Sequence, residues 1–92
     1  MKESQIESAS CKASKLIGWW GIKLVPLKMA GLPDRMFIGH GKIVFIEYKI
    51  PGGKLRPIQK AVHAKFAKHG ITVYVSYSVG DTLKILNDER KI

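Results

Sequence analysis

The chain has 92 residues, 46% of them hydrophobic, and a formal net charge of +9 from 16 Lys and Arg against 7 Asp and Glu. Length and composition predict one small globular domain and exclude a disordered chain. No apolar run approaches the roughly 20 residues that span a bilayer, and the N-terminus lacks an apolar segment of signal-peptide type. The single cysteine, Cys11, excludes an internal disulfide and a cysteine zinc site. We therefore expect a soluble, cytoplasmic protein.

Hydrophobic periodicity divides the chain into seven elements separated by glycine and proline. Gly18 and Gly70 are typical helix ends, Pro26 stops the first strand, and Pro57 suits the first position of a helix. The predicted elements are a helix over 3–17, strands over 19–25, 34–39 and 42–49, a helix over 57–69, a strand over 72–77 and a short helix over 81–86.

The order α-β-β-β-α-β-α predicts the fold class. A helix between the third and fourth strands permits a crossover, which makes the fourth strand parallel to the third. The expected architecture is α/β, a small mixed four-stranded sheet flanked by helices. Residues 1–92 form a single domain in this interpretation, with a core over about 3–86 and a polar C-terminal tail over 87–92.

The positive charge favours a polyanionic partner. A chain with a pI near 9.9 is positively charged at neutral pH and attracts phosphate backbones. Binding to an anionic membrane is less favoured, because the sequence lacks an amphipathic helix with a Lys-rich face. Lys54 and Arg56 are the favoured phosphate contacts, because their loop follows the acid-x-Lys segment 47–49. The full set of candidate contacts is Lys23, Lys28, Arg35, Lys42, Lys54, Arg56, Lys60, Lys65 and Lys68.

Two carboxylates stand alone in this basic chain. Between Ser8 and Gly80 only Asp34 and Glu47 are acidic, against 12 Lys and Arg. A two-residue turn at positions 40 and 41 would pair residues whose numbers sum to 81, so Asp34 would face Glu47 with Cβ atoms about 4.5–5.5 Å apart. Two like charges so close need compensation, and carboxylates are the ligands that Mg²⁺ and Mn²⁺ prefer.

Alternation places Lys49 on the same face of its strand as Glu47. Two acids can hold a metal that activates water, and a lysine beside them can orient or deprotonate that water. The alternative is that Asp34 is an ordinary turn residue after proline and that Glu47 and Lys49 are solvated at a strand end. A register slip of one residue would also separate the pair.

These residues resemble the PD-(D/E)xK nuclease superfamily, with Pro33-Asp34 followed by Glu47-Tyr48-Lys49. Over about residues 3–86 the chain more closely resembles a stand-alone VRR-NUC domain, the virus-type replication-repair nuclease module. That family pattern has an acid in the first helix, Gly-x-Pro-Asp-Arg, acid-x-Lys and a Gln on the next helix. The matching positions are Glu7, 31–35, 47–49 and Gln59.

The resemblance implies a restriction-endonuclease-like core and a role for each matching residue. Glu3 lies one turn before Glu7 on the same helix face, so either can be the helix acid; Glu7 is favoured because Glu3 sits near a terminus. The implied roles are Asp34, Glu47 and the backbone carbonyl of Tyr48 as metal ligands, Glu7 as a ligand directly or through water, Lys49 at the attacking water, and Gln59 orienting Lys49 or contacting nucleic acid.

The expected function is that of an Mg²⁺- or Mn²⁺-dependent DNA endonuclease. No base-reading module is present, which favours branched DNA such as a Holliday junction, in replication, recombination or repair. The resemblance and small size also suggest a homodimer and a viral source. The alternatives are a non-catalytic basic nucleic-acid-binding module and a sequence-specific restriction enzyme, for which the chain is short.

Tryptophan, cysteine and histidine carry weaker signals. In the pair Trp19-Trp20, alternation predicts one core side chain and one exposed side chain for a dimer interface or a base. Cys11 is expected in the core. The three histidines lack zinc-ligand spacing, and His40 is expected to be a turn residue; they are His40, His63 and His69.

Overall fold

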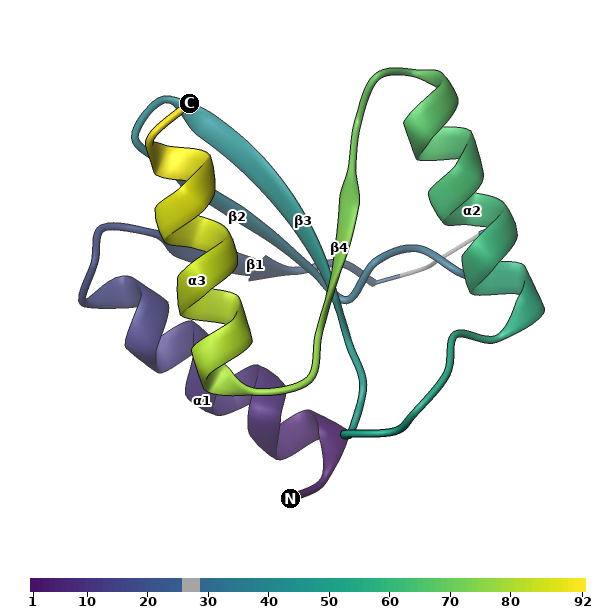
Figure 1. Cartoon of the computed structure of the whole chain (residues 1–92), viewed down its shortest axis with the longest axis horizontal. Coiled ribbons are helices and arrows are strands. Elements are labelled where there is room, and N and C mark those ends of the chain that lie inside the picture. The colour runs from purple at the N-terminus through teal and green to yellow at the C-terminus, as the bar shows by residue number, and fades with distance from the viewer. Residues whose placement is uncertain (26–28) are drawn as a thin grey trace.

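The computed structural model describes residues 1–25 and 29–92. Pro26, predicted to stop the first strand, and Lys28, a predicted phosphate contact, lie outside these residues. The observed order confirms the predicted one (Figure 1). In chain order the elements are α1 (Glu3–Lys15), β1 (Trp20–Lys23), β2 (Arg35–Gly39), β3 (Lys42–Tyr48), α2 (Pro57–Lys68), β4 (Val73–Ser76) and α3 (Val79–Arg90).

The four strands form one mixed sheet in the order β1-β2-β3-β4. The two pairs among the first three strands are antiparallel, and β4 runs parallel to β3 after the crossover through α2. The predicted mixed sheet and its crossover are therefore confirmed. The carboxyl end of β3 and the start of β2 meet at one edge of the sheet, where the predicted acid pair lies.

The turn between β2 and β3 sets the register of the hairpin. His40 and Gly41 both have positive φ, 51° and 75°, as the two-residue turn that suits the twist of a hairpin requires. Gly39 pairs with Lys42, and all five pairs of the ladder have numbers that sum to 81. The predicted register is confirmed.

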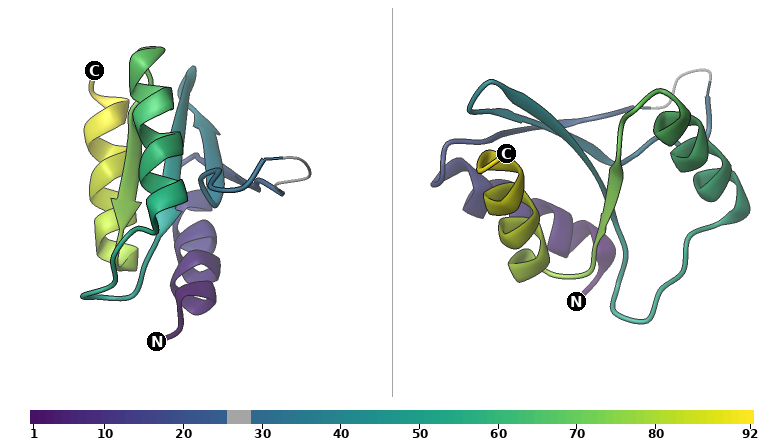
Figure 2. Two further views of the ribbon diagram at one scale, coloured as in Figure 1. Left: turned by 90° about the vertical axis from the view of Figure 1, so that its right-hand side faces the viewer. Right: turned by 45° about the horizontal axis from the view of Figure 1, so that its top comes forward.

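Helices cover the two faces of the sheet unequally. Helices α1 and α3 lie together on one side, and α2 lies on the other beside β4 (Figures 1 and 2). The core forms between the sheet and the α1–α3 pair, and none of the described helices is long and apolar enough to cross a membrane. The buried core residues are Ile6, Trp19, Phe37, Val44, Ile46, Tyr48 and Leu86, with Cys11 packed against them.

The last helix is longer than predicted. It runs from Val79 to Arg90, so most of the predicted tail over 87–92 is helical. Ser78 caps its N-terminus by accepting the backbone N–H of Asp81 at 3.0 Å. At its C-terminus the Nζ atom of Lys42 donates to the carbonyl of Glu89 at 2.6 Å. Lys42, a candidate phosphate contact, therefore caps a helix, a long-range contact that periodicity does not reveal.

Candidate active site

The two isolated carboxylates meet where the β2–β3 hairpin opens. The ladder ends with Arg35 opposite Ile46, and the next step in the same register places Asp34 opposite Glu47. The backbone N–H of Tyr48 donates to Oδ2 of Asp34 at 2.7 Å, which fixes the aspartate against β3. Sequence reasoning predicted this juxtaposition, and the hairpin geometry confirms it.

The loop before Asp34 explains the Gly-x-Pro-Asp motif. Gly31 has a φ of +86°, and a Cβ atom there would lie 2.8 Å from the carbonyl oxygen of Ile58 in α2. Only glycine permits both the backbone conformation and this close approach. Pro33 is fully buried between Gly31 and Asp34. The motif thus anchors the aspartate against the N-terminal turn of α2.

Glu47 is an almost fully buried carboxyl, with 1% of its surface exposed. Its pKa is raised from 4.5 to about 8, chiefly by burial and then by the neighbouring Asp34 carboxyl, while the charge of Lys49 opposes the shift. Lys49 itself is only 8% exposed and pairs through its backbone N–H with Ser76 at 3.1 Å. The sequence predicted that the two acids and the lysine lie together; it did not predict that Glu47 and Lys49 are buried and Asp34 half-buried.

Gln59 links α2 to the acid pair. Its Oε1 atom accepts the backbone N–H of Arg56 at 2.8 Å, and its Nε2 atom donates to Oε2 of Glu47 at 3.1 Å. The first bond caps the helix and leaves the amide NH₂ directed at the carboxylate. Sequence reasoning placed Gln59 beside Lys49 or nucleic acid, whereas its hydrogen bonds among the described residues go to Glu47 and to the helix cap.

His63 is a site residue that the sequence analysis missed. It lies one turn after Gln59 on α2, with Nε2 3.9 Å from Oε1 of Glu47 and a side chain 12% exposed. Burial lowers its pKa, the charge of Lys49 lowers it further, and that of Asp34 opposes the shift. The signal in the sequence was the i, i+4 spacing from Gln59, which puts both side chains on one helix face. Zinc-ligand spacing alone does not reveal this role.

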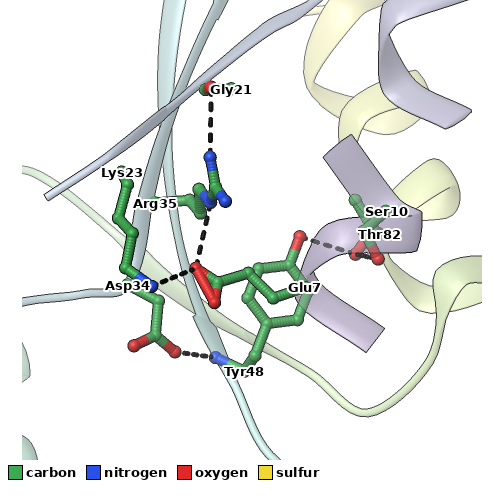
Figure 3. A network of polar contacts seen from close by, with 8 residues as sticks. All are labelled: Glu7, Ser10, Gly21, Lys23, Asp34, Arg35, Tyr48 and Thr82. Atoms are coloured by element: carbon green, nitrogen blue, oxygen red, sulfur yellow. Dashed lines mark hydrogen bonds and ion pairs between the residues drawn. The ribbon is translucent and has the colours of Figure 1, made fainter. Parts of the chain in front are cut away.

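The two helix acids lie in different surroundings. Glu7, 7% exposed, accepts the Nε–H of Arg35 at 3.0 Å and lies 3.8 Å from Nζ of Lys23, as Figure 3 shows. Glu3 is exposed, and its negative charge contributes to the raised pKa of Glu47. The charge of Glu7 is thus balanced by Arg35 and Lys23, whereas the charge of Glu3 reaches Glu47. Either residue therefore remains a candidate for the helix acid of the site.

Arg35 has internal partners as well. Besides Glu7, its Nη1 atom donates to the carbonyl of Gly21 at 3.4 Å, and its side chain is 19% exposed. This bonding ties α1 to β1 and β2 next to Asp34 (Figure 3). Its predicted contact with nucleic acid stays a prediction.

A buried network of hydroxyl groups supports the strand that carries Glu47. The Tyr48 hydroxyl lies 3.0 Å from Oγ1 of Thr82, which donates to Ser10 at 3.1 Å and lies 2.8 Å from the Ser76 hydroxyl. The network joins β3 and β4 to α1 and α3, and part of it is visible in Figure 3. Burial raises the pKa of Tyr48 to about 12, so the phenol stays protonated. The network therefore holds in place the residue whose backbone binds Asp34.

Exposed basic side chains lie on the segments that flank the site residues in sequence. Lys54 and Arg56 lie on the loop between β3 and α2, and Lys60 lies in the first turn of that helix. The side chain of Lys23, at the end of β1, is 62% exposed and lies 3.8 Å from Glu7. The predicted phosphate contacts closest in sequence to the site are thus free to meet solvent, next to the positive end of α2.

Comparison with known proteins agrees with this geometry. The chain is 34% identical over 90 residues to "Putative nuclease p44" of Acyrthosiphon pisum secondary endosymbiont phage 1, covering 95% of this chain and 97% of the relative. A solved structure described as a VRR_NUC domain superposes with a TM-score of 0.84 at 28% identity, covering 95% of this chain and 96% of the other. The chain belongs to the VRR-NUC family. No family model matches it.

Membership in the VRR-NUC family confirms the predicted resemblance, fold and general class, which is that of a nuclease. The site's donors fit a divalent cation, because Glu47 keeps one buried oxygen, Oε1, without a hydrogen-bond partner and Asp34 stands beside it. In residues 1–25 and 29–92, no three His, Cys, Asp or Glu side chains gather as a metal cluster. A cation here would combine the two carboxylates with further oxygens from the backbone, from water or from a helix acid, a donor set that suits Mg²⁺.

Proposed function

We propose that this VRR-NUC protein is a divalent-metal-dependent endonuclease that hydrolyses phosphodiester bonds in branched DNA. The observation that carries the proposal is the buried Glu47 carboxyl beside Asp34, with a raised pKa and an oxygen that lacks a partner. A protein seldom retains such an electrostatic conflict except where it is functional. A cation is the simplest group that relieves it.

Asp34, Glu47 and the backbone carbonyl of Tyr48 would hold Mg²⁺ or Mn²⁺, with Glu7 or Glu3 reaching it directly or through water. When bound, the metal polarises the phosphate and lowers the pKa of a bound water. Lys49 has its charge close enough to act on Glu47 and is placed to orient or deprotonate the attacking water. Gln59 holds one oxygen of Glu47 and so keeps the carboxylate in one orientation.

DNA is the proposed substrate because of the charge and its location. The chain carries +9, and the exposed Lys54, Arg56 and Lys60 lie on the loop and first helical turn around Gln59, which bonds Glu47. Phosphate contacts position a duplex without reading its sequence. Selectivity would then come from DNA shape, which favours flaps and four-way junctions and places the enzyme in replication, recombination or repair.

An open apolar face of the sheet supports the predicted homodimer. Trp20 pairs with Ile38, and Ile38 pairs with Ile43, so the three share one face. This face lies opposite the core, since Trp19 is 2% exposed and Trp20 is 66% exposed, as predicted for the tryptophan pair. The next row on the same face consists of Ile22, Met36 and Phe45.

A second copy of the chain would cover this face. Exposed apolar patches mark interaction surfaces, and a small domain gains needed stability by burying one. Ile43, 59% exposed, is the test position: Ile43→Lys should convert a dimer to a monomer in light scattering. Leu16→Lys, at a position 88% exposed at the end of α1, is the control and should leave the mass unchanged.

The phage origin of the relative supports the predicted viral source for this chain as well. A viral nuclease of this kind would act in the cytoplasm of the host cell, on branched intermediates of replication or recombination.

Cleavage of a labelled substrate panel tests the proposal. Single strand, duplex, flap, bubble and four-way junction are incubated with Mg²⁺, Mn²⁺ or EDTA, and the parent is compared with Glu47→Gln. Metal-dependent cutting that prefers branched substrates and is lost in the variant is expected. Tight, salt-sensitive binding without cutting on every substrate would instead identify a non-catalytic DNA-binding module.

A further inference from the structure

Helix α2 presents two side chains, one turn apart, to the two oxygens of a single carboxylate. Nε2 of Gln59 donates to Oε2 of Glu47 at 3.1 Å. Nε2 of His63 faces the other oxygen, Oε1, across 3.9 Å. Both His63 Nε2 and Glu47 Oε1 are buried, and neither has a hydrogen-bond partner within residues 1–25 and 29–92.

The gap between these two atoms is small. A normal N–H···O bond spans about 2.7–3.2 Å, so a side-chain movement of about 1 Å would join them. Each buried polar atom without a partner costs about 1–3 kcal/mol, and such atoms are rare in folded proteins without a functional reason. One hydrogen bond between two such atoms that face each other would satisfy both.

We infer that His63 is a positioning residue, which donates its Nε2–H to Oε1 of Glu47 when that carboxylate holds the divalent cation. With Gln59 it would form a two-armed clamp that leaves the remaining lone pairs of Glu47 for the metal. The inference rests on the proposed metal-dependent nuclease function.

The clamp follows from how carboxylate ligands are usually held. Hydrogen bonds to a ligating side chain fix its orientation, and losing one typically costs 10–100-fold in metal affinity or activity. His63 acts through Glu47 here, since its Nε2 atom faces Oε1 of that carboxylate across 3.9 Å. Gln59 and His63 share a rigid helix, so both arms are preorganised together.

Three variants separate the clamp from simple packing. His63→Phe keeps a ring of similar size without a donor, and His63→Gln restores an N–H donor without the ring. His69→Phe changes an exposed histidine at the end of the same helix and serves as the control. Affinity for Mn²⁺ and Mg²⁺ is measured by calorimetry, metal-free stability by denaturant unfolding, and kcat and KM on the best DNA substrate.

The clamp predicts a 10–100-fold loss of metal affinity and of kcat in His63→Phe, with KM for DNA little changed and metal-free stability not lowered. His63→Gln should recover most of the affinity, and His69→Phe should match the parent. Electron spin echo spectra of the Mn²⁺-loaded parent should contain no imidazole nitrogen modulation.

Three results would overturn the inference. If His63→Phe binds metal and cuts like the parent, His63 has no positioning role, and the nuclease proposal stands. If the Mn²⁺ spectra contain imidazole modulation that His63→Phe removes, His63 is a ligand. If the parent neither binds metal nor cuts DNA, the proposed function fails together with the clamp.

Discussion

Replacing Glu47 by glutamine should stabilise the metal-free protein at neutral pH while it abolishes cleavage. The carboxyl is 1% exposed, and burial together with Asp34 raises its pKa to about 8. Glutamine has nearly the same shape and never ionises. Its amide oxygen can accept the N–H of Gln59, and its NH₂ can donate to Asp34.

The sign and size follow from linkage. The pKa of Glu47 is higher in the folded protein than in the unfolded chain, so its contribution to stability is fully present below about pH 4.5 and is lost as pH rises through about 8. Each pH unit in this window costs about 1.4 kcal/mol, so the cost from pH 5 to pH 7 is about 3 kcal/mol. Because the Asp34 carboxyl contributes to the raised pKa of Glu47, part of this cost depends on Asp34.

Denaturant unfolding in EDTA at pH 5 and pH 7 measures the effect. The unfolding free energy of Glu47→Gln minus that of the parent should be about 3 kcal/mol larger at pH 7 than at pH 5. Asp88→Asn, which removes a carboxylate 58% exposed on α3, should show no comparable change between the two pH values. A difference between Glu47→Gln and the parent that is equal at both pH values would refute a raised pKa at Glu47.

Addition of a divalent metal should restore the stability that the parent loses at pH 7. A cation takes the place of the proton on Glu47, so Mn²⁺ should stabilise the parent at pH 7 and should leave Glu47→Gln nearly unchanged.

The remaining predictions concern the supports of the site. Gln59→Leu removes both the donor to Glu47 and a helix cap, so calorimetry should detect a 10–100-fold loss of metal affinity and unfolding a loss of about 1–2 kcal/mol; unchanged affinity would contradict the bond's role. Thr82→Val leaves buried hydroxyls without a partner and should cost about 1–3 kcal/mol in denaturant unfolding, whereas equal stability would argue against the network. The double variant Lys54→Ala with Arg56→Ala should lower the salt slope of DNA binding by about 2 in filter binding, equally for all sequences; a loss confined to one sequence would indicate base reading instead.

Local chemistry made the acid pair predictable from the sequence. The turn at His40 and Gly41 admits positive φ at both positions, and a two-residue turn leaves only one register for the strands beyond it. That register places Asp34 opposite Glu47 without knowledge of any long-range contact.

Long-range partners were not predictable in the same way. The ion pair between Glu7 and Arg35 and the approach of His63 to Glu47 depend on how α1 and α2 dock on the sheet. Local periodicity reports which face of a helix is buried but not which buried atom it meets. The last turns of α3 were missed for the same reason, since Lys42 caps them from another element.

The proposed metal-dependent nuclease activity is tested most directly by single-turnover cleavage of a four-way junction. The rate is measured as the Mn²⁺ concentration is raised, for the parent and for Asp34→Asn. This variant keeps the shape of the side chain and can still accept the N–H of Tyr48, so the fold should survive. We expect a saturating, metal-dependent rate in the parent and a loss of at least about 100-fold in the variant. Equal rates in the two proteins, or no metal dependence in the parent, would contradict the role of the acid pair.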